Sequence, residues 1–539
     1  MKKIVLIVIL VLVLSAQAQW SSDPSANTFL AYYISNYQVT SDNRGGAVVG
    51  WEDFNTGRIY LQRLDRYGYK LWGENGIPVA VNMQQAADFG LCATDPDHFV
   101  IIYPNIQPSG DCLRLMAQKL DTLGNRLWGD DGIPVKTQVD TVIGAVRVLP
   151  DGFGGVYFTW LDERVAPYQR QFFIQHLDAD GNCTWAENGI PLSSEDDHIQ
   201  GFANMTASYP GLVMTFWIIE SSPGWAFTGQ LLNLVGNKLW GESGWILPVY
   251  YGGSAQISDQ QGGTIITGNT NLATYSQRVD TSASFLWSGN GVQLCETSVS
   301  PSLKMALGPN LSTYYLWYNE SYSVYLQRVT TEGMKLFGPD GINVSYGGFN
   351  MWPAVINADG INVIGTWQET QNDRIIAQKF DSTGSNLWDS DGVVVTTNTY
   401  FASTAWMISD MNGGAIIFWT MPLGQLYAQQ VSANGNLGEI LAVLENPQSI
   451  MPRQITLLPA YPNPFNPTST IRYALPEAGK VTLAVYDISG RLVATLADGV
   501  RTAGIHEATF DAAHLSSGVY VYRLSVADYS AAGKLVLMK

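Results

Sequence analysis

The sequence is poor in charge, and this shortage narrows the class of protein. Charged residues make up 14% of the 539 residues, against 46% hydrophobic and 12% aromatic residues, which is typical of folded, β-rich chains. The 46 Asp and Glu outnumber the 29 Lys and Arg, so the formal net charge is −17. Because such a surface repels a phosphate backbone, we expect no nucleic-acid partner. The length predicts about two to four domains.

Cysteine is also scarce. The four cysteines are Cys92, Cys112, Cys183 and Cys295, and no Cys-x-x-Cys spacing suggests zinc. Cys92 and Cys112 lie within one repeat and could form a disulfide in an oxidising compartment. A chain of this length does not need disulfides in order to fold.

Long hydrophobic runs are absent except at the N-terminus. There, Lys2 and Lys3 precede an 11-residue apolar run from Ile4 to Leu14, and Ala16-Gln17-Ala18 supplies the small residues of a cleavage site. The run is shorter than the roughly 20 residues that a bilayer span needs. We therefore predict a signal peptide at residues 1–18, a mature chain that begins near Gln19, and no membrane span in the mature chain.

An internal repeat fills most of the sequence. Its signature is a Gln followed ten residues later by Trp or Phe, and successive Gln residues are 47 to 57 positions apart. The pairs are Gln62 with Trp72, Gln118 with Trp128, Gln175 with Trp185, Gln230 with Trp240, Gln277 with Trp287, Gln327 with Phe337 and Gln378 with Trp388. An eighth copy at Gln429 has lost the Trp.

Each repeat reads as four short strands, expected in the second repeat at 88–94, 98–104, 113–121 and 132–136. The residues two before and two after each Gln are mostly apolar, so the Gln lies on an apolar strand face. We interpret it as a buried amide whose hydrogen bonds go to neighbouring backbone, because an unpaired amide costs about 1–3 kcal/mol. The Asp-x-x-Gly turn that follows partly resembles the Asp-box turns of sialidase-type propellers.

Units of this length with four strands each predict a β-propeller, which closes into a ring and removes exposed sheet edges. We expect an all-β protein with an eight-bladed propeller at residues 28–445. Seven blades are the alternative if the fifth or eighth unit does not form a full blade. An open array or two smaller rings fit the repeat less well.

A different β pattern follows the repeats. Residues 446–458 contain two prolines and no alternation, and predict a linker. Beyond them we expect strands at 470–474, 480–487, 491–496, 506–510, 519–527 and 532–538, a small antiparallel sandwich at 459–539.

Ordered motifs in this tail resemble a known family. They are Tyr461-Pro462-Asn463-Pro464-Phe465, Tyr486-Asp487-Ile488-Ser489-Gly490-Arg491, Leu515-Ser516-Ser517-Gly518-Val519-Tyr520 and the ending Lys534 to Lys539. Together they resemble the type A C-terminal sorting domain of the type IX secretion system, and also the immunoglobulin-like domain of the flagellar hook-capping protein. The resemblance implies a Gram-negative, Bacteroidetes-like host, passage through the periplasm and recognition by an outer-membrane translocon. The protein is then secreted or held at the cell surface.

No catalytic motif is present in the repeats: there is no Gly-x-Ser-x-Gly, no His-Glu-x-x-His and no phosphate-binding glycine loop. In several repeats, however, acids follow the Trp that ends the second strand. These acids are Glu52, Asp53, Asp162, Glu163, Glu220, Glu320 and Glu369. Since the hairpins between second and third strands emerge on one face of a propeller, we expect a broken ring of carboxylates beside Trp. Such a ring is a candidate ligand site for a cation or sugar hydroxyls.

Asp178-Ala179-Asp180-Gly181 and Asp389-Ser390-Asp391-Gly392 resemble fragments of calcium loops without the bidentate acid, so we expect turns and no cofactor, with calcium as the alternative. The leading functional hypothesis is an exported binding module for a glycan or a protein. The alternatives are a glycoside hydrolase or lyase with carboxylates in the central funnel, and a structural exoprotein without a ligand. Paired carboxylates that converge on a pocket would favour the enzyme.

Overall fold

The computed structural model describes residues 20–83, 88–106, 113–136, 142–166, 169–192, 204–209, 211–221, 224–247, 255–269, 273–295, 303–345, 350–397, 403–438, 456–457, 460, 465–475, 478–502, 504–526 and 529–538. The signal peptide expected at 1–18 lies outside them. The regular secondary structure of the described residues is β-strand, apart from a single 3-10 turn at Pro309–Leu311. No helix in this part of the chain has the length and apolarity to cross a membrane.

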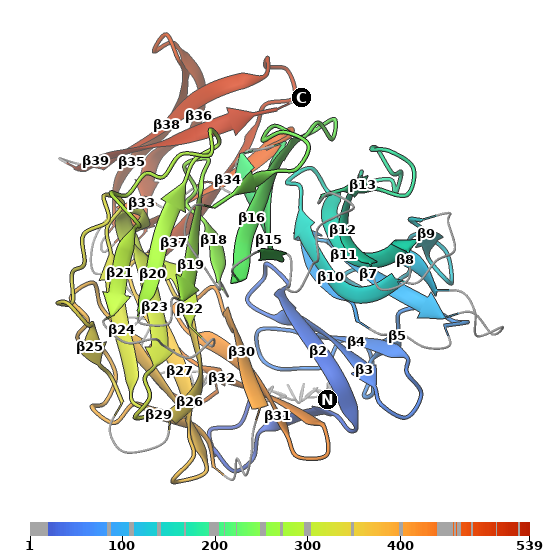
Figure 1. Cartoon of the computed structure of the whole chain (residues 1–539). Coiled ribbons are helices and arrows are strands. Elements are labelled where there is room, and N and C mark those ends of the chain that lie inside the picture. Colours follow the sequence, from blue (N-terminus) through green and yellow to red (C-terminus); the bar gives the residue numbers. More distant parts are fainter. Residues whose placement is uncertain are drawn as a thin grey trace, which may run out of the picture.

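The described residues before position 438 form eight antiparallel four-stranded sheets, coloured from blue to orange in Figure 1. The first four sheets are β2–β5 (Ile34–Ser41, Ala47–Asp53, Ile59–Leu64, Ile77–Pro78), β6–β9 (Gly90–Asp95, His98–Ile106, Leu113–Asp121, Ile133–Pro134), β10–β13 (Val142–Pro150, Val156–Ala166, Gln169–Leu177, Ile190–Pro191) and β14–β17 (Asn204–Tyr209, Leu212–Ser221, Gly224–Asn233, Trp245–Ile246). The next three are β18–β21 (Gln256–Ser258, Thr264–Asn269, Thr274–Val279, Val292–Cys295), β22–β25 (Lys304–Leu307, Thr313–Tyr318, Val324–Val329, Ile342–Asn343) and β26–β29 (Asn350–Asn357, Val363–Glu369, Arg374–Phe380, Val393–Thr397). The eighth contains β30–β32 (Ser403–Ser409, Ala415–Met421, Gln425–Val431) and the N-terminal strand β1 (Thr28–Ala31).

The sheets are arranged as the blades of a closed ring. The first strand of each sheet contacts the first strand of the next, from β2 through β6, β10, β14, β18, β22 and β26 to β30, and β30 contacts β2. The fifth unit, which the sequence left in doubt, has its four strands. The eighth has three strands of its own and gains its fourth from β1, which pairs with β32 through Thr28 opposite Ala428. The propeller is confirmed, and the alternative of an open array is wrong.

The repeated glutamines explain why every blade folds alike. The Gln118 side chain is fully buried; its Nε2 donates to Gly129 O at 2.6 Å, and its Oε1 accepts from the Trp128 and Lys119 backbone N–H, each at 3.1 Å. Gln230 repeats these contacts at 2.7, 3.0 and 3.1 Å. The amide thus fixes the turn that brings the Trp back onto the blade, as predicted, and it leaves no buried amide group unsatisfied.

The repeated tryptophans join each blade to the next. The Trp72 indole N–H donates to Thr122 O in the turn of the second blade at 3.1 Å. A Cβ placed on Gly124 of that turn would lie 3.1 Å from the Trp72 ring, and Gly124 has φ +84°. Glycine therefore fits both the backbone and the indole at this position. Trp185, Trp240, Trp287 and Trp388 make the same bond to the turns that follow them.

The eighth blade has no Trp ten residues after Gln429, and Trp20 takes the place of that Trp. The Trp20 indole N–H donates to Arg66 O in the turn of the first blade at 3.0 Å, and a Cβ on Gly68 would lie 2.6 Å from the ring. Gln429 Nε2 donates to Ser21 O at 2.9 Å, where other blades use their own turn. The N-terminal segment, defined here as residues 20–31, thus supplies the Trp, the turn carbonyl and the outer strand that this repeat lacks.

The described residues of the C-terminal domain form two packed sheets, drawn in red in Figure 1. One contains β33 (Thr456–Leu457), β34 (Thr468–Leu475) and β37 (Gly504–Asp511); the other contains β36 (Leu492–Arg501), β35 (Gly479–Asp487), β38 (Gly518–Val526) and β39 (Tyr529–Leu537). Their shared core includes Phe465, Ile471, Leu483, Phe510 and Leu524. The predicted sandwich is therefore confirmed.

One smaller expectation was wrong, and one possibility that the spacing left open is excluded. Thr456 and Leu457, placed in the predicted linker 446–458, pair with Ala474 and Tyr473 and belong to the sandwich. Cys92 is a buried free thiol, so it does not form the disulfide with Cys112 that the spacing allowed; Cys112 itself lies outside the described residues.

Candidate functional site

Asp162, one of the predicted ligand acids, is fully buried in the third blade. Its Oδ2 is 2.7 Å from Lys136 Nζ of the second blade, whose side chain is also fully buried, and it accepts the Trp160 indole N–H at 3.1 Å. A carboxylate without access to solvent cannot reach a soluble ligand. Here it neutralises a buried ammonium group between two blades.

The other predicted acids have separate surroundings. Glu369 is buried, forms an ion pair with Arg374 and accepts from Asn372 Nδ2 at 3.0 Å. Asp53 Oδ1 accepts from the Thr56 backbone N–H at 2.7 Å and stabilises its own turn. Glu320 is exposed in the turn after β23. The side chains of Glu163 and Glu220 lie outside the described ones.

Glu52 belongs to a polar cluster between the first three blades. Burial raises its pKa, and so does the charge of the nearby Asp88. Burial also raises the pKa of Asp88, although Arg147 Nη1 lies 3.7 Å from its Oδ2. Asp88 accepts the backbone N–H of Phe89 at 2.8 Å and of Val146 at 3.1 Å, and Asn36 Nδ2 at 3.2 Å. Both carboxylate oxygens of Asp88 thus accept hydrogen bonds that link β2, β6 and β10.

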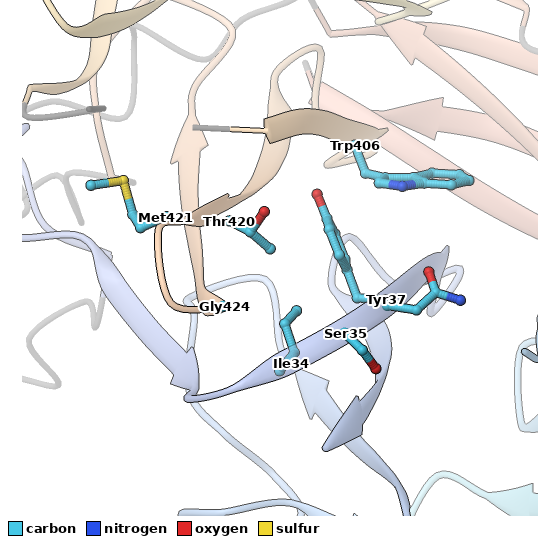
Figure 2. Close-up of a pocket in the computed structure, with 8 residues that line it drawn as sticks. Ile34, Ser35, Tyr37, Trp406, Thr420, Met421 and Gly424 are labelled. Atoms are coloured by element: carbon cyan, nitrogen blue, oxygen red, sulfur yellow. The ribbon is translucent and has the colours of Figure 1, made fainter. Parts of the chain in front are cut away.

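A pocket of about 300 Å³ lies beside this cluster, at the seam where the eighth blade meets the first. It is lined by Ile34, Ser35, Asn36, Tyr37, Trp406, Thr420, Met421 and Gly424. Figure 2 shows the Trp406 indole above Ser35 and Tyr37, with Thr420 and Met421 across the pocket. The Ile34 N–H donates to Gly424 O at 3.0 Å, which fixes the floor of the seam.

Trp406 is unusual among the tryptophans of the ring. It is 45% exposed, whereas Trp51, Trp160, Trp217, Trp317 and Trp419 are at most 4% exposed. No ring among the described residues stacks on it. Trp406 pairs with Phe418, the residue before the repeated Trp419, and in four other blades this position holds Gln38, Arg147, Asn204 and Lys304. The second blade has Gly90 at this position and the seventh has Ala354. The eighth blade therefore places an exposed indole where four other blades place a polar side chain and two place a small residue.

The polar wall of the pocket is neutral. Ser35 is exposed, Asn36 and Thr420 are half-buried, and the buried Tyr37 hydroxyl donates to Phe418 O at 3.3 Å. The Asn36 amide is held by Asp88, so its orientation is fixed before a ligand arrives. The site combines one aromatic platform with amide and hydroxyl groups.

The calcium-like segments form capped turns. Asp178 Oδ1 accepts from the backbone N–H of Asp180 at 3.0 Å and of Asn182 at 2.8 Å. Asp389 supplies its backbone O to Gln378 Nε2 at 2.8 Å. Within the residues described, no three His, Cys, Asp or Glu side chains come together as a metal site.

The sorting motifs occupy turns and the last strands of the sandwich. Gly490, with φ +80°, closes a turn in which Asp487 Oδ1 accepts from the Arg491 N–H and Oδ2 from its Nε, both at 3.0 Å. Gly518 and Tyr520 begin β38, and the Tyr520 hydroxyl donates to Ser516 O at 2.8 Å. Lys534 lies on β39. Pro462, Asn463, Pro464 and Lys539 lie outside the described residues.

Comparison with known proteins identifies the tail. Residues 459–538 match the model of the secretion system C-terminal sorting domain. The chain is thus a propeller protein with a type IX sorting domain, and it is secreted or exposed at the cell surface. The comparison with curated proteins finds no match.

Several solved structures match this chain at a sequence identity of about 10%. Prolyl oligopeptidase B from Galerina marginata is 10% identical, with 74% of this chain and 56% of that chain covered and a TM-score of 0.39. PorZ, a surface component of the type IX secretion system of Porphyromonas gingivalis, is 10% identical, with 95% and 100% covered and a TM-score of 0.19. An endo-arabinase from Bacteroides thetaiotaomicron is 10% identical, with 49% and 99% covered and a TM-score of 0.26. The chain spans less than two thirds of the peptidase structures it matches.

Sequence reasoning missed Trp406. Its signal was present, since the eighth repeat has a Trp in its first strand where four other repeats have a polar residue. Finding it required the strand register, because the first strands carry no repeated anchor residue of their own.

Proposed function

We propose that the propeller is a carbohydrate-binding module and that its ligand packs against Trp406. The observation that carries this proposal is an indole, 45% exposed, in a pocket whose other polar groups are neutral amides and hydroxyls. The C–H face of a sugar ring suits an aromatic face, and its hydroxyls suit Asn36, Ser35 and Thr420. Leaving an indole exposed costs hydrophobic free energy that a bound sugar recovers.

Binding is favoured over hydrolysis by the state of the nearby acids. A glycosidase needs two carboxylates free to exchange protons or attack the sugar. Beside the pocket, Asp88 accepts three hydrogen bonds and faces Arg147, so it is not available for either role, and among the described residues Glu52 has no second free carboxylate to act with. Asp162 and Glu369, which sequence reasoning placed in the same ring, are paired with Lys136 and Arg374.

A glycan array probed with the full-length protein tests the proposal, followed by titration of the best glycan. Trp406→Ala is expected to weaken binding by about tenfold or more, since aromatic anchors commonly contribute over about 1.4 kcal/mol. Phe54→Ala, which removes a 73% exposed ring outside the pocket, is the matched control and should bind as the wild type does.

Unchanged affinity in Trp406→Ala would place the ligand elsewhere and contradict the proposal. Release of reducing sugar from the bound glycan by the wild-type protein would favour the enzyme instead. Binding of no glycan on the array would leave a protein ligand as the better explanation of the pocket.

A further inference from the structure

The outward face of the four-stranded sheet in the sorting domain is divided into two halves. On β35 and β38 the inward side chains, among them Leu483, Val485, Tyr522 and Leu524, form the core. The outward positions near one end are polar: Thr482 is opposite Ser525, and Ser525 is opposite Ser530. An antiparallel sheet with one solvated face is expected to be polar over all of that face.

The other half of the face is apolar. One row across β36, β35 and β38 contains Leu492, Tyr486 and Val521. Val519 is two residues before Val521 on β38, so its side chain lies on the same face. Leu492 is 55% exposed, and Val519 and Val521 are each 37% exposed, in the context of the whole chain. Lys534 continues the row on β39, opposite Val521, and is exposed. We call Tyr486, Leu492, Val519 and Val521 the outer patch.

We propose that the outer patch is the surface by which the translocon recognises this domain. The family match defines the domain as one that a secretion system sorts, so a partner has to read some part of its folded surface. Exposed, contiguous apolar side chains on a small soluble domain mark such interaction surfaces. Tyr486 and Val519 belong to the motif segments 486–491 and 515–520, and Leu492 and Val521 directly follow these segments. The two motifs are adjacent in the fold because β35 pairs with β38, with Tyr486 opposite Val521 and Asp487 opposite Tyr520.

Charge indicates what kind of partner surface fits. The chain has a formal net charge of −17, yet its last 81 residues hold seven Lys and Arg against six Asp and Glu. An acidic partner surface therefore repels the propeller but not the tail. We infer a partner groove that is apolar at its centre and acidic at its rim.

The test is export of the full-length protein in a host that has the translocon. The variant Leu492→Asp/Val521→Asp places two charges in the outer patch, and its ratio of extracellular to periplasmic protein is expected to fall by about tenfold or more. Ser525→Asp, on the polar half of the same face, is the matched control and should be exported normally. Both purified variants should unfold at the wild-type temperature, because the substituted side chains point away from the core.

Normal export of the double aspartate variant would overturn the proposal, and so would an equal export defect in Ser525→Asp. If the aspartates lower the unfolding temperature, Val519→Thr/Val521→Thr replaces them in the test. Threonine keeps the β-branched shape and removes apolar surface only. That variant should fold normally and be exported several-fold less well, and wild-type export of it would equally overturn the proposal.

Discussion

Seven of the repeated glutamines connect the third strand of their blade to the turn that follows. Each donates one hydrogen bond to a backbone carbonyl and accepts two from backbone N–H groups, as Gln327 does with Gly338, Phe337 and Arg328. A polar residue is retained on an apolar face because the folded chain satisfies it completely. The Gln therefore recurs in the sequence because the fold needs it, and not because it binds a ligand.

The variant Gln118→Met tests this role. Methionine fills a similar volume but leaves Gly129 O and the Trp128 N–H without their partner, so we expect the free energy of unfolding to fall by about 2–4 kcal/mol. Denaturant unfolding followed by tryptophan fluorescence measures it. Leu123→Ser, at a 79% exposed position in the same turn, is the control. Equal stability of the two variants would contradict the assigned role.

At the scale of elements, the N-terminal segment holds three blades together. Strand β1 pairs with β32 of the eighth blade, Asn27 Nδ2 donates to Val395 O of the seventh at 3.2 Å, and Trp20 contacts the first. The candidate pocket begins only three residues beyond this segment, at Ile34, and opens across the same seam. The segment that completes the ring therefore ends beside the pocket.

We expect Trp20→Ala to destabilise the protein about as much as Trp185→Ala, by roughly 3–5 kcal/mol, because the two indoles fill equivalent seams and make the same kind of bond to the next blade. Thermal unfolding of the two variants measures the comparison. Tyr32→Ala removes a 56% exposed ring just after the same segment and should change little. A Trp20→Ala variant as stable as Tyr32→Ala would show that the ring closes without this indole.

At the scale of the whole molecule, the repeat was enough to predict the architecture. Gln and Trp recur at fixed spacing because the same contacts of these two residues stabilise each blade. The number of repeats therefore predicted the number of sheets. Trp20 could not be assigned from the sequence, since it lies next to the predicted signal peptide and far from the repeat it completes.

The candidate site was harder to predict for the same kind of reason. The position of Asp162 after a Trp suggested a ligand acid, but its partner Lys136 comes from the preceding blade. Whether a carboxylate is buried, paired or open depends on the neighbouring sheet, which local spacing does not specify. Trp406 likewise forms a pocket only together with Ser35 and Asn36, which lie about 370 residues earlier in the chain.

The central claim is that an exported eight-bladed ring binds a glycan at the seam between its last and first blades. The most direct measurement is a crystal structure of the full-length protein grown with the glycan that binds it best. The account predicts a sugar ring stacked on the Trp406 indole, with hydroxyls within hydrogen-bonding distance of Asn36 or Ser35. A sugar bound at any other place on the ring, with the Trp406 pocket filled only by solvent, would contradict it.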